Sequence, residues 1–453
     1  MTSKLGFYGG TGSVTGANFL LDTGNSRFLI DCGLIQGGRF ASAENAKPFV
    51  YEPASVNALL VTHAHADHIG RIPKLVKDGF KGAIYSTAPT QALALIMLRD
   101  AYEVMLQEGG QTGVEPIYEP GDIDKAMSLW QTVNYEEELP LGDGVTAILS
   151  DAGHILGSAF ISLIRDGKTV VFTGDIGNVP QPLMPAPSVP RGYDYLVMES
   201  VYGDRQHEEV GERTELLRQY ILDTEKKQGT LIIPAFSLER TQGLLLEINN
   251  LFERGEAKPL PTFLDSPLAI EATTIYRQFA GYLKPEVRQQ IKDGDDIFNF
   301  PKLSLSNTAE DSRGINKVKG AKIIIAGSGM SHGGRILAHE KHYLEDKNTT
   351  LLLVGYQSVG SLGRRLQDGA KAVEIDGVEV KVRARIARIR GYSGHADRDQ
   401  LIDFVAEGGD KAKTVFVTMG EERASLFLVQ RLRDYLGVNA VAPSLGEEVE
   451  IEF

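Results

Sequence analysis

The stretch His63-Ala64-His65-Ala66-Asp67-His68 decides how this chain is interpreted. It places three imidazoles and one carboxylate within little more than one helical turn, directly after the apolar run Ala58-Leu59-Leu60-Val61. These four side chains cannot all face one way on a regular helix or strand. They can converge if a strand ends in a loop here and a helix begins, and residues 69–76 are predicted to form that helix. Because short histidine-rich tracts with imidazole and carboxylate ligands are usually metal sites, the sequence predicts a metalloprotein that binds zinc or a similar divalent ion.

Length and composition describe an ordinary globular protein. A single core stops growing at roughly 250–300 residues, so 453 residues predict two or three domains. No window approaches the ~18 apolar residues of a membrane span, and the N-terminus shows no apolar signal segment. One cysteine, Cys32, excludes an internal disulfide and fits a reducing compartment. We therefore expect a cytoplasmic protein without a membrane partner. A net charge of -13 argues against a broadly basic nucleic-acid surface, although an acidic total can hide a basic cleft.

Further candidate ligands follow apolar runs in the first two hundred residues. Asp31 follows one such run, His154 lies shortly after another, and Asp175 follows a third. Layered α/β proteins deliver side chains to one edge of their sheets in this way. An isolated His or Asp after a strand is more often a turn cap. Here, however, a two-ion site would need more ligands than the opening motif supplies. This favours a metal-binding role for His154 and Asp175.

The pattern changes at about residue 205, where apolar strands begin to alternate with helices. Residues 322–326 and 350–354 are largely apolar, as in strands buried on both faces of a parallel sheet. We predict a doubly wound domain over 206–365, inserted between a first segment at 1–205 and a third at 366–453.

The residues of the first domain resemble the metallo-β-lactamase superfamily. Asp31, the motif at 63–68, His154 and Asp175 match its pattern in order and in position at strand ends. The resemblance implies an αββα sandwich with metals at the sheet edge, so the fold class is α/β. It also implies that one ion is held by His63, His65 and His154, that a second is held by Asp67 and His68, that Asp175 bridges the two, and that Asp31 orients a ligand imidazole.

Later segments are similar to the β-CASP group, the nucleic-acid-processing members that include RNase J and the metal-bearing subunit of the pre-mRNA cleavage factor. The matching segments are residues 198–207, 234–242, 264–269, 327–335 and 392–397. This resemblance implies that the doubly wound insert is a β-CASP domain. It further implies that His395 completes the second metal site and that Glu199 fixes the orientation of His395.

One position departs from the family pattern. Arg365 stands in a segment where members of the eukaryotic type carry a histidine, the proposed general acid. Arginine cannot donate a proton at neutral pH, so the general acid is left open. We expect Arg365 to bind phosphate instead. A glycine-rich loop could cradle phosphate as well, through Ser328, Ser331, His332 and Arg335.

Two further features are a run of basic residues and a pair of histidines outside the metal motif. Basic residues recur over 381–390, and this stripe could follow a phosphate backbone, although a solvated strand face is about equally consistent with it. His339 and His342 fall on a predicted helix, and we expect both at the surface.

Together these features predict a zinc-dependent ribonuclease. Two zinc ions about 3.5–4 Å apart can activate a bridging hydroxide and neutralise phosphoryl charge. The expected catalytic residues are Asp31, Asp67, Asp175, Glu199 and His395. The alternatives are a small-molecule metallohydrolase of the same superfamily and a non-catalytic RNA-binding scaffold. Mn²⁺ in place of Zn²⁺, DNA as a substrate, a homodimer, and internal or terminal cleavage all stay open.

Overall fold

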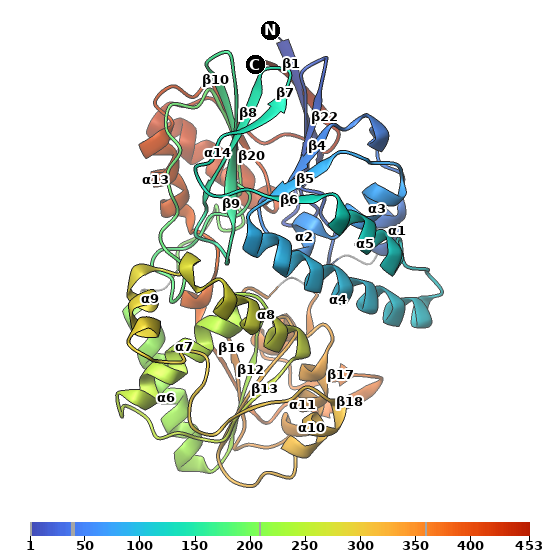
Figure 1. Ribbon diagram of the computed structural model, residues 1–453. Helices are drawn as coiled ribbons and strands as arrows, with labels where there is room; N and C mark the ends of the chain where they lie inside the picture. The colour runs from blue at the N-terminus through green and yellow to red at the C-terminus, as the bar shows by residue number, and fades with distance from the viewer. Residues whose placement is uncertain (1, 38–40, 208–209, 358–359) are drawn as a thin grey trace. The chain divides into compact units, whose positions relative to one another are not determined.

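A computed structural model describes residues 2–37, 41–207, 210–357 and 360–453 of the chain (Figure 1). The chain forms two compact units. Unit 1 comprises the chain up to Val179 together with Ala186–Gln206 and His395–Phe453, and unit 2 comprises Pro180–Pro185 and His207–Gly394. Among the described residues, every helix is too short or too polar to cross a bilayer.

Unit 1 contains two seven-stranded sheets. The first has the order β22 (Glu447–Glu452), β1 (Thr2–Gly9), β2 (Asn18–Asp22), β3 (Arg27–Ile30), β4 (Ala58–Leu60), β5 (Ala83–Ser86) and β6 (Trp130–Thr132). The second has the order β21 (Ala440–Val441), β20 (Thr414–Val417), β11 (Tyr195–Met198), β10 (Lys168–Phe172), β9 (Ala159–Arg165), β8 (Val145–Asp151) and β7 (Leu139–Gly142).

The two sheets of unit 1 pack face to face around one apolar core. In β1, Leu5 and Phe7 are fully buried, whereas Lys4, directly before Leu5, is exposed, in keeping with the two-residue period of a strand. Phe7 meets Phe416 of the second sheet, with ring centroids 5.1 Å apart. This core holds the two sheets together as the inner layers of a sandwich.

Helices form the outer layers of unit 1. Those packed on the second sheet are α13 (Arg398–Gly408) and α14 (Glu422–Leu436), whose apolar residues share a core with that sheet's outward face. Beside the first sheet lie α1 (Ala41–Ala46), the 3₁₀ turn Pro53–Ser55, α2 (Ala66–Ile69), α3 (Ile72–Lys77), α4 (Ala88–Thr112) and α5 (Pro120–Ser128) (Figure 1). The layers confirm the αββα sandwich.

Unit 2 is built on a six-stranded parallel sheet. Its order is β14 (Leu303–Leu305), β13 (Thr262–Asp265), β15 (Lys322–Ala326), β12 (Thr230–Pro234), β16 (Thr350–Leu353) and β19 (Arg385–Arg388). Every residue of β12, β15 and β16 is buried, so helices cover both faces, as the apolar runs predicted.

The connections of unit 2 are mainly helical. They are α6 (Val210–Lys227), α7 (Arg240–Glu253), α8 (Pro267–Gln278), α9 (Pro285–Lys292), α10 (Ala309–Ile315), α11 (Arg335–Tyr343) and α12 (Leu362–Gln367), with 3₁₀ turns at Ala280–Tyr282 and Arg390–Tyr392. A hairpin of β17 (Ala372–Ile375) and β18 (Val378–Lys381) follows α12.

The end of unit 2 differs from the predicted boundary at residue 365. Strand β19 pairs with β16, with Ile386 opposite Leu351, and therefore extends the sheet of unit 2. The alternating pattern near residue 380 belongs to the β17–β18 hairpin rather than to the sandwich. Residues 366–394 thus belong to unit 2, and the basic stripe over 381–390 is divided between β18, β19 and the turns beside them.

Candidate metal centre

The opening motif lies where β4 gives way to α2. The backbone N–H and the hydroxyl of Thr62 each donate a hydrogen bond of 2.8 Å to the buried Asp31 carboxylate, which anchors the chain as it leaves the sheet. His63 and His65 then occupy the loop, while Asp67 and His68 lie on α2. The helix starts earlier than the predicted 69–76 and is interrupted, because α2 ends at Ile69 and α3 begins at Ile72.

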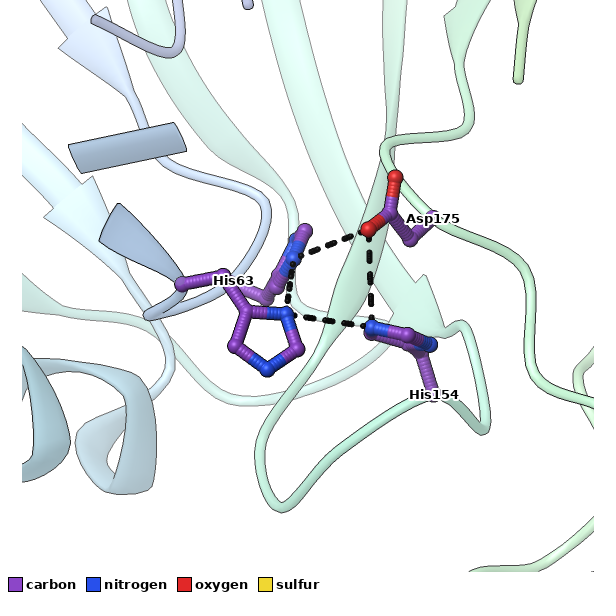
Figure 2. Close-up of side chains that lie close together, drawn as sticks. His63, His154 and Asp175 are labelled. Atoms are coloured by element: carbon purple, nitrogen blue, oxygen red, sulfur yellow. Dashed lines mark hydrogen bonds and ion pairs between the residues drawn. The ribbon is translucent and has the colours of Figure 1, made fainter. Parts of the chain in front are cut away.

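Imidazoles from two distant segments of unit 1 lie around one carboxylate oxygen of Asp175 (Figure 2). Asp175 Oδ2 lies 3.3 Å from His63 Nε2 and 3.5 Å from His154 Nε2. The Nδ1 atom of His65 lies 3.1 Å from His63 Nε2 and 3.2 Å from His154 Nε2. These four ligand atoms lie within 4.8 Å of one another, a spacing at which one divalent ion can contact them all.

The other oxygen of Asp175 faces a different histidine. Asp175 Oδ1 lies 3.4 Å from His68 Nε2, and Asp67 Oδ2 lies 3.9 Å from the same nitrogen. On its far side, His68 Nδ1 contacts Asp31 Oδ2 at 2.7 Å, so the Asp31 carboxylate fixes the orientation of the imidazole. Asp175 is therefore placed between two groups of ligands.

Two atoms of this arrangement test whether a metal fits. His68 Nε2 and Asp175 Oδ1 are buried and have no hydrogen-bond partner within the described parts of the chain. Buried polar atoms are nearly always paired, since leaving one unpaired is costly. A buried imidazole nitrogen and a buried carboxylate oxygen that face each other without a hydrogen bond match the donor set of a divalent metal. The residues present fit a metal ion.

The electrostatics of the cluster also suit metal binding. Burial lowers the pKa of His65 and His154 well below the usual value, so both imidazoles are neutral and keep a lone pair for a ligand bond. Burial also opposes the charged form of His68, but the Asp175 and Asp31 carboxylates outweigh it and raise the pKa of His68 well above its usual value. In the absence of a cation, His68 thus holds the proton that balances these carboxylates.

Glu199 and His395 form a pair at the rim of the cluster. His395 Nδ1 lies 3.3 Å from Glu199 Oε1, and the backbone N–H of Ile176 donates to that same oxygen at 2.6 Å. The nearest Asp175 atom to His395 Nδ1 is Oδ2, at 3.8 Å. Glu199, His395 and Asp175 therefore form a second group of ligand atoms. His395 lies on the same side of Asp175 as His63 and His154, whereas the resemblance implied that it joins Asp67 and His68.

Comparison with known proteins accounts for most of the chain. Residues 20–179 match the metallo-beta-lactamase superfamily domain, residues 241–366 the Beta-Casp domain, and residues 379–443 the Zn-dependent metallo-hydrolase RNA specificity domain. A Thermus thermophilus protein named Ribonuclease TTHA0252 is 37% identical over 98% of this chain and 99% of its own length. The chain belongs to the β-CASP group of the metallo-β-lactamase superfamily.

Other relatives of this β-CASP protein have different names. An RNase J-like protein of Methanocaldococcus jannaschii is 31% identical over 98% of both chains. Transcription termination factor FttA of Methanosarcina mazei is 31% identical over 98% of this chain and 71% of its own length. Among solved structures, a protein of unknown function from Enterococcus faecalis V583 covers both chains fully with a TM-score of 0.56 and 11% identity, which shows a shared fold alone.

The predicted phosphate-binding residues of the β-CASP domain have unequal environments. Ser331 is buried and donates to Glu340 Oε1 at 2.5 Å. Arg335 donates to Asp265 Oδ1 at 2.6 Å and to two backbone carbonyls, so its guanidinium has a structural role. The half-buried Ser328 accepts a hydrogen bond from the backbone of His332, which is exposed. Arg365, on α12, is also exposed.

The expectation of a surface position was wrong for His339. Its side chain is 2% exposed, and its Nε2 lies 2.7 Å from the buried Asp265 Oδ2. The sequence did carry a signal, because Arg335 and His339 are four residues apart and face the same way on a helix. The sequence pattern also gave no role to Tyr202. Its ring lies 6.2 Å from that of His395, between ring centroids.

Proposed function

We propose that this chain is a zinc-dependent ribonuclease that hydrolyses RNA phosphodiester bonds. The observation that carries the proposal is Asp175, which directs one oxygen toward His63 and His154 and the other toward His68. The full-length likeness to a protein named as a ribonuclease, together with the match to an RNA specificity domain, supports RNA as the substrate.

Two ions would be held by different residues. His63, His65, His154 and Asp175 would hold the first, and Asp67, His68 and Asp175 the second. Zinc held by these residues would supply Lewis-acid chemistry and would lower the pKa of a bound water, so that no protein base would be needed. The role of Asp31 is to hold His68 so that Nε2 points at Asp175.

The pair of His395 and Glu199 offers an answer to the open question of the general acid. Glu199 is fully buried, and two backbone N–H groups donate to it, so its carboxylate is fixed in place. It contacts Nδ1 of His395 and thereby sets the tautomer of the ring. The other ring nitrogen, Nε2, is then the atom that hands a proton to the leaving oxygen. Arg365 is not needed for this step.

The two alternatives explain less of the chain. A small-molecule hydrolase has no use for the β-CASP domain or the match over residues 379–443. A non-catalytic scaffold has no use for ligand atoms gathered closely enough to hold a metal.

The test is cleavage of end-labelled single-stranded RNA by protein stripped of metal with a chelator and then reloaded. We expect activity to be lost on stripping and restored by Zn²⁺, with Mn²⁺ and a DNA strand as comparison arms. Hydrolysis of a thioester or lactone without RNA cleavage would favour the small-molecule enzyme. RNA binding with neither metal nor cleavage would favour the scaffold.

A further inference from the structure

Helix α14 of unit 1 holds an arginine between two aromatic rings. The guanidinium carbon of Arg431 lies 4.8 Å from the ring centroid of Phe427 and 5.2 Å from that of Tyr435. Its Nη1 also donates to the Tyr435 hydroxyl at 2.7 Å. Residues four apart share one face of a helix, so Arg423 continues the same row by one turn. We call Arg423, Phe427, Arg431 and Tyr435 the α14 stripe.

The α14 stripe lies at the surface. Tyr435 is 62% exposed, and the neighbouring Leu426 is 53% exposed. Large apolar side chains scattered over a surface are ordinary. Here, however, rings and guanidinium groups alternate along one face of a fifteen-residue helix. That alternation is typical of surfaces that bind single-stranded nucleic acid.

The charge of Arg431 is not neutralised by a neighbour. Within the described residues, no carboxylate lies within ion-pair distance of its guanidinium, in a chain whose net charge is -13. The guanidinium lies against both rings, and among the described residues one of its five N–H groups is used, by the Tyr435 hydroxyl. A fixed guanidinium with donors to spare is suited to a phosphate group.

A series of contacts leads from the metal centre to the α14 stripe. The Tyr202 ring lies 6.2 Å from His395, and the guanidinium of Arg205 lies 5.7 Å from the Tyr202 ring. Asp204 then pairs with both Arg205, at 2.6 Å, and Arg423, at 3.8 Å. All of these residues belong to unit 1. Contacts through Tyr202, Arg205 and Asp204 therefore connect His395 with Arg423, the first residue of the stripe.

We propose that the α14 stripe binds a single-stranded segment of RNA that continues from the metal centre. The proposal rests on the ribonuclease function proposed above. The exposed Tyr435 ring and the half-buried Phe427 ring stack on bases, which are accessible only in an unpaired strand, while Arg431 and Arg423 contact phosphates. The stripe thereby adds affinity outside the metal centre and favours long unpaired RNA over short fragments.

The experiment measures RNA affinity by fluorescence anisotropy with an unstructured 20-nucleotide RNA. The full chain carries Asp67→Ala so that the RNA stays intact. Adding Arg431→Ala and Tyr435→Ala together is expected to raise Kd about tenfold or more. Arg431→Ala alone is expected to lower the slope of log affinity against log salt by about 0.7, and Arg431→Lys to restore that slope. Arg99→Ala removes one charge from an exposed site on α4 and serves as the matched control, with Kd and slope retained.

Three outcomes separate the possibilities. Unchanged affinity and unchanged salt slope in both stripe variants would overturn the proposal. A change of sedimentation mass in the double variant, without a change in RNA affinity, would assign the stripe to a protein interface instead. If the stripe variants weaken RNA binding as expected, but the chain with Asp67 intact and loaded with Zn²⁺ never cleaves RNA, the ribonuclease function fails while the stripe stands.

Discussion

His68 Nε2 and Asp175 Oδ1 face each other at 3.4 Å, both buried and both without a hydrogen-bond partner in the described parts of the chain. The other ends of both side chains are occupied, since His68 Nδ1 contacts Asp31 and Asp175 Oδ2 contacts His63. The fold therefore holds these two atoms facing each other although neither forms a hydrogen bond there. A divalent ion between them would satisfy both.

Loss of a ligand carboxylate should remove activity. We predict that Asp67→Ala and Asp175→Ala each lower the rate of RNA cleavage by roughly 100-fold or more. Mutating a residue that only hydrogen-bonds to a metal ligand already lowers metal affinity or activity by about 10- to 100-fold. Circular dichroism should show the fold retained. Near-normal cleavage by either variant would exclude the two-ion arrangement.

The role of His395 can be separated from that of a ligand. If it delivers a proton, His395→Gln should lower kcat about 100-fold and leave the metal content unchanged. The measurement pairs single-turnover kinetics with elemental analysis of the same sample. Loss of one ion in this variant would return His395 to the metal site that the resemblance implied.

Adjacent arginines on α12 test the predicted phosphate contact in the β-CASP domain. The Arg365 side chain is exposed and has no hydrogen bond or ion pair within the described residues, whereas the Arg364 side chain pairs with Asp368 at 2.9 Å. Arg365→Ala should weaken RNA binding and lower the salt slope by about 0.7, because one phosphate contact is lost. Arg364→Ala is the control, and an equal effect of the two variants would show a general charge effect instead.

A buried carboxyl in unit 2 should make stability depend on pH. Burial raises the pKa of Glu239 from 4.5 to about 7, although the Tyr276 hydroxyl, which donates to it at 2.7 Å, acts against the shift. Between these two values the unfolded chain ionises while the folded chain stays neutral. Stability from this group is therefore present below about pH 4.5 and falls as pH rises to about 7, by about 3 kcal/mol.

Glu239→Gln should abolish that dependence, because the amide stays neutral at every pH. Urea unfolding at pH 5 and pH 8 would measure the difference in the free energy of unfolding. Glu271→Gln, at an exposed position on α8, is the control. An identical loss of stability in the parent chain and in Glu239→Gln would show that the Glu239 carboxyl titrates normally.

Much of the site could be predicted because each ligand follows an apolar strand. Asp31 follows β3 of the first sheet, and Asp175 follows β10 of the second. Both strands end at the edge of the sandwich where the motif at 63–68 lies. The side of Asp175 on which His395 lies could not be predicted, since it depends on the rotation of one carboxylate. His339 was misplaced because its partner Asp265 lies 74 positions away along the chain. The extent of unit 2 was missed because β19, at the edge of the sheet, has an exposed arginine at each end and lacks the apolar run that marks the inner strands.

The most direct test of the account is anomalous diffraction at the zinc absorption edge from crystals of the zinc-loaded protein. We predict two peaks, one contacting Asp175 Oδ2 with His63, His65 and His154, and one contacting Asp175 Oδ1 with Asp67 and His68. A single peak, or none, in protein that cleaves RNA would contradict the claim that Asp175 joins two ions.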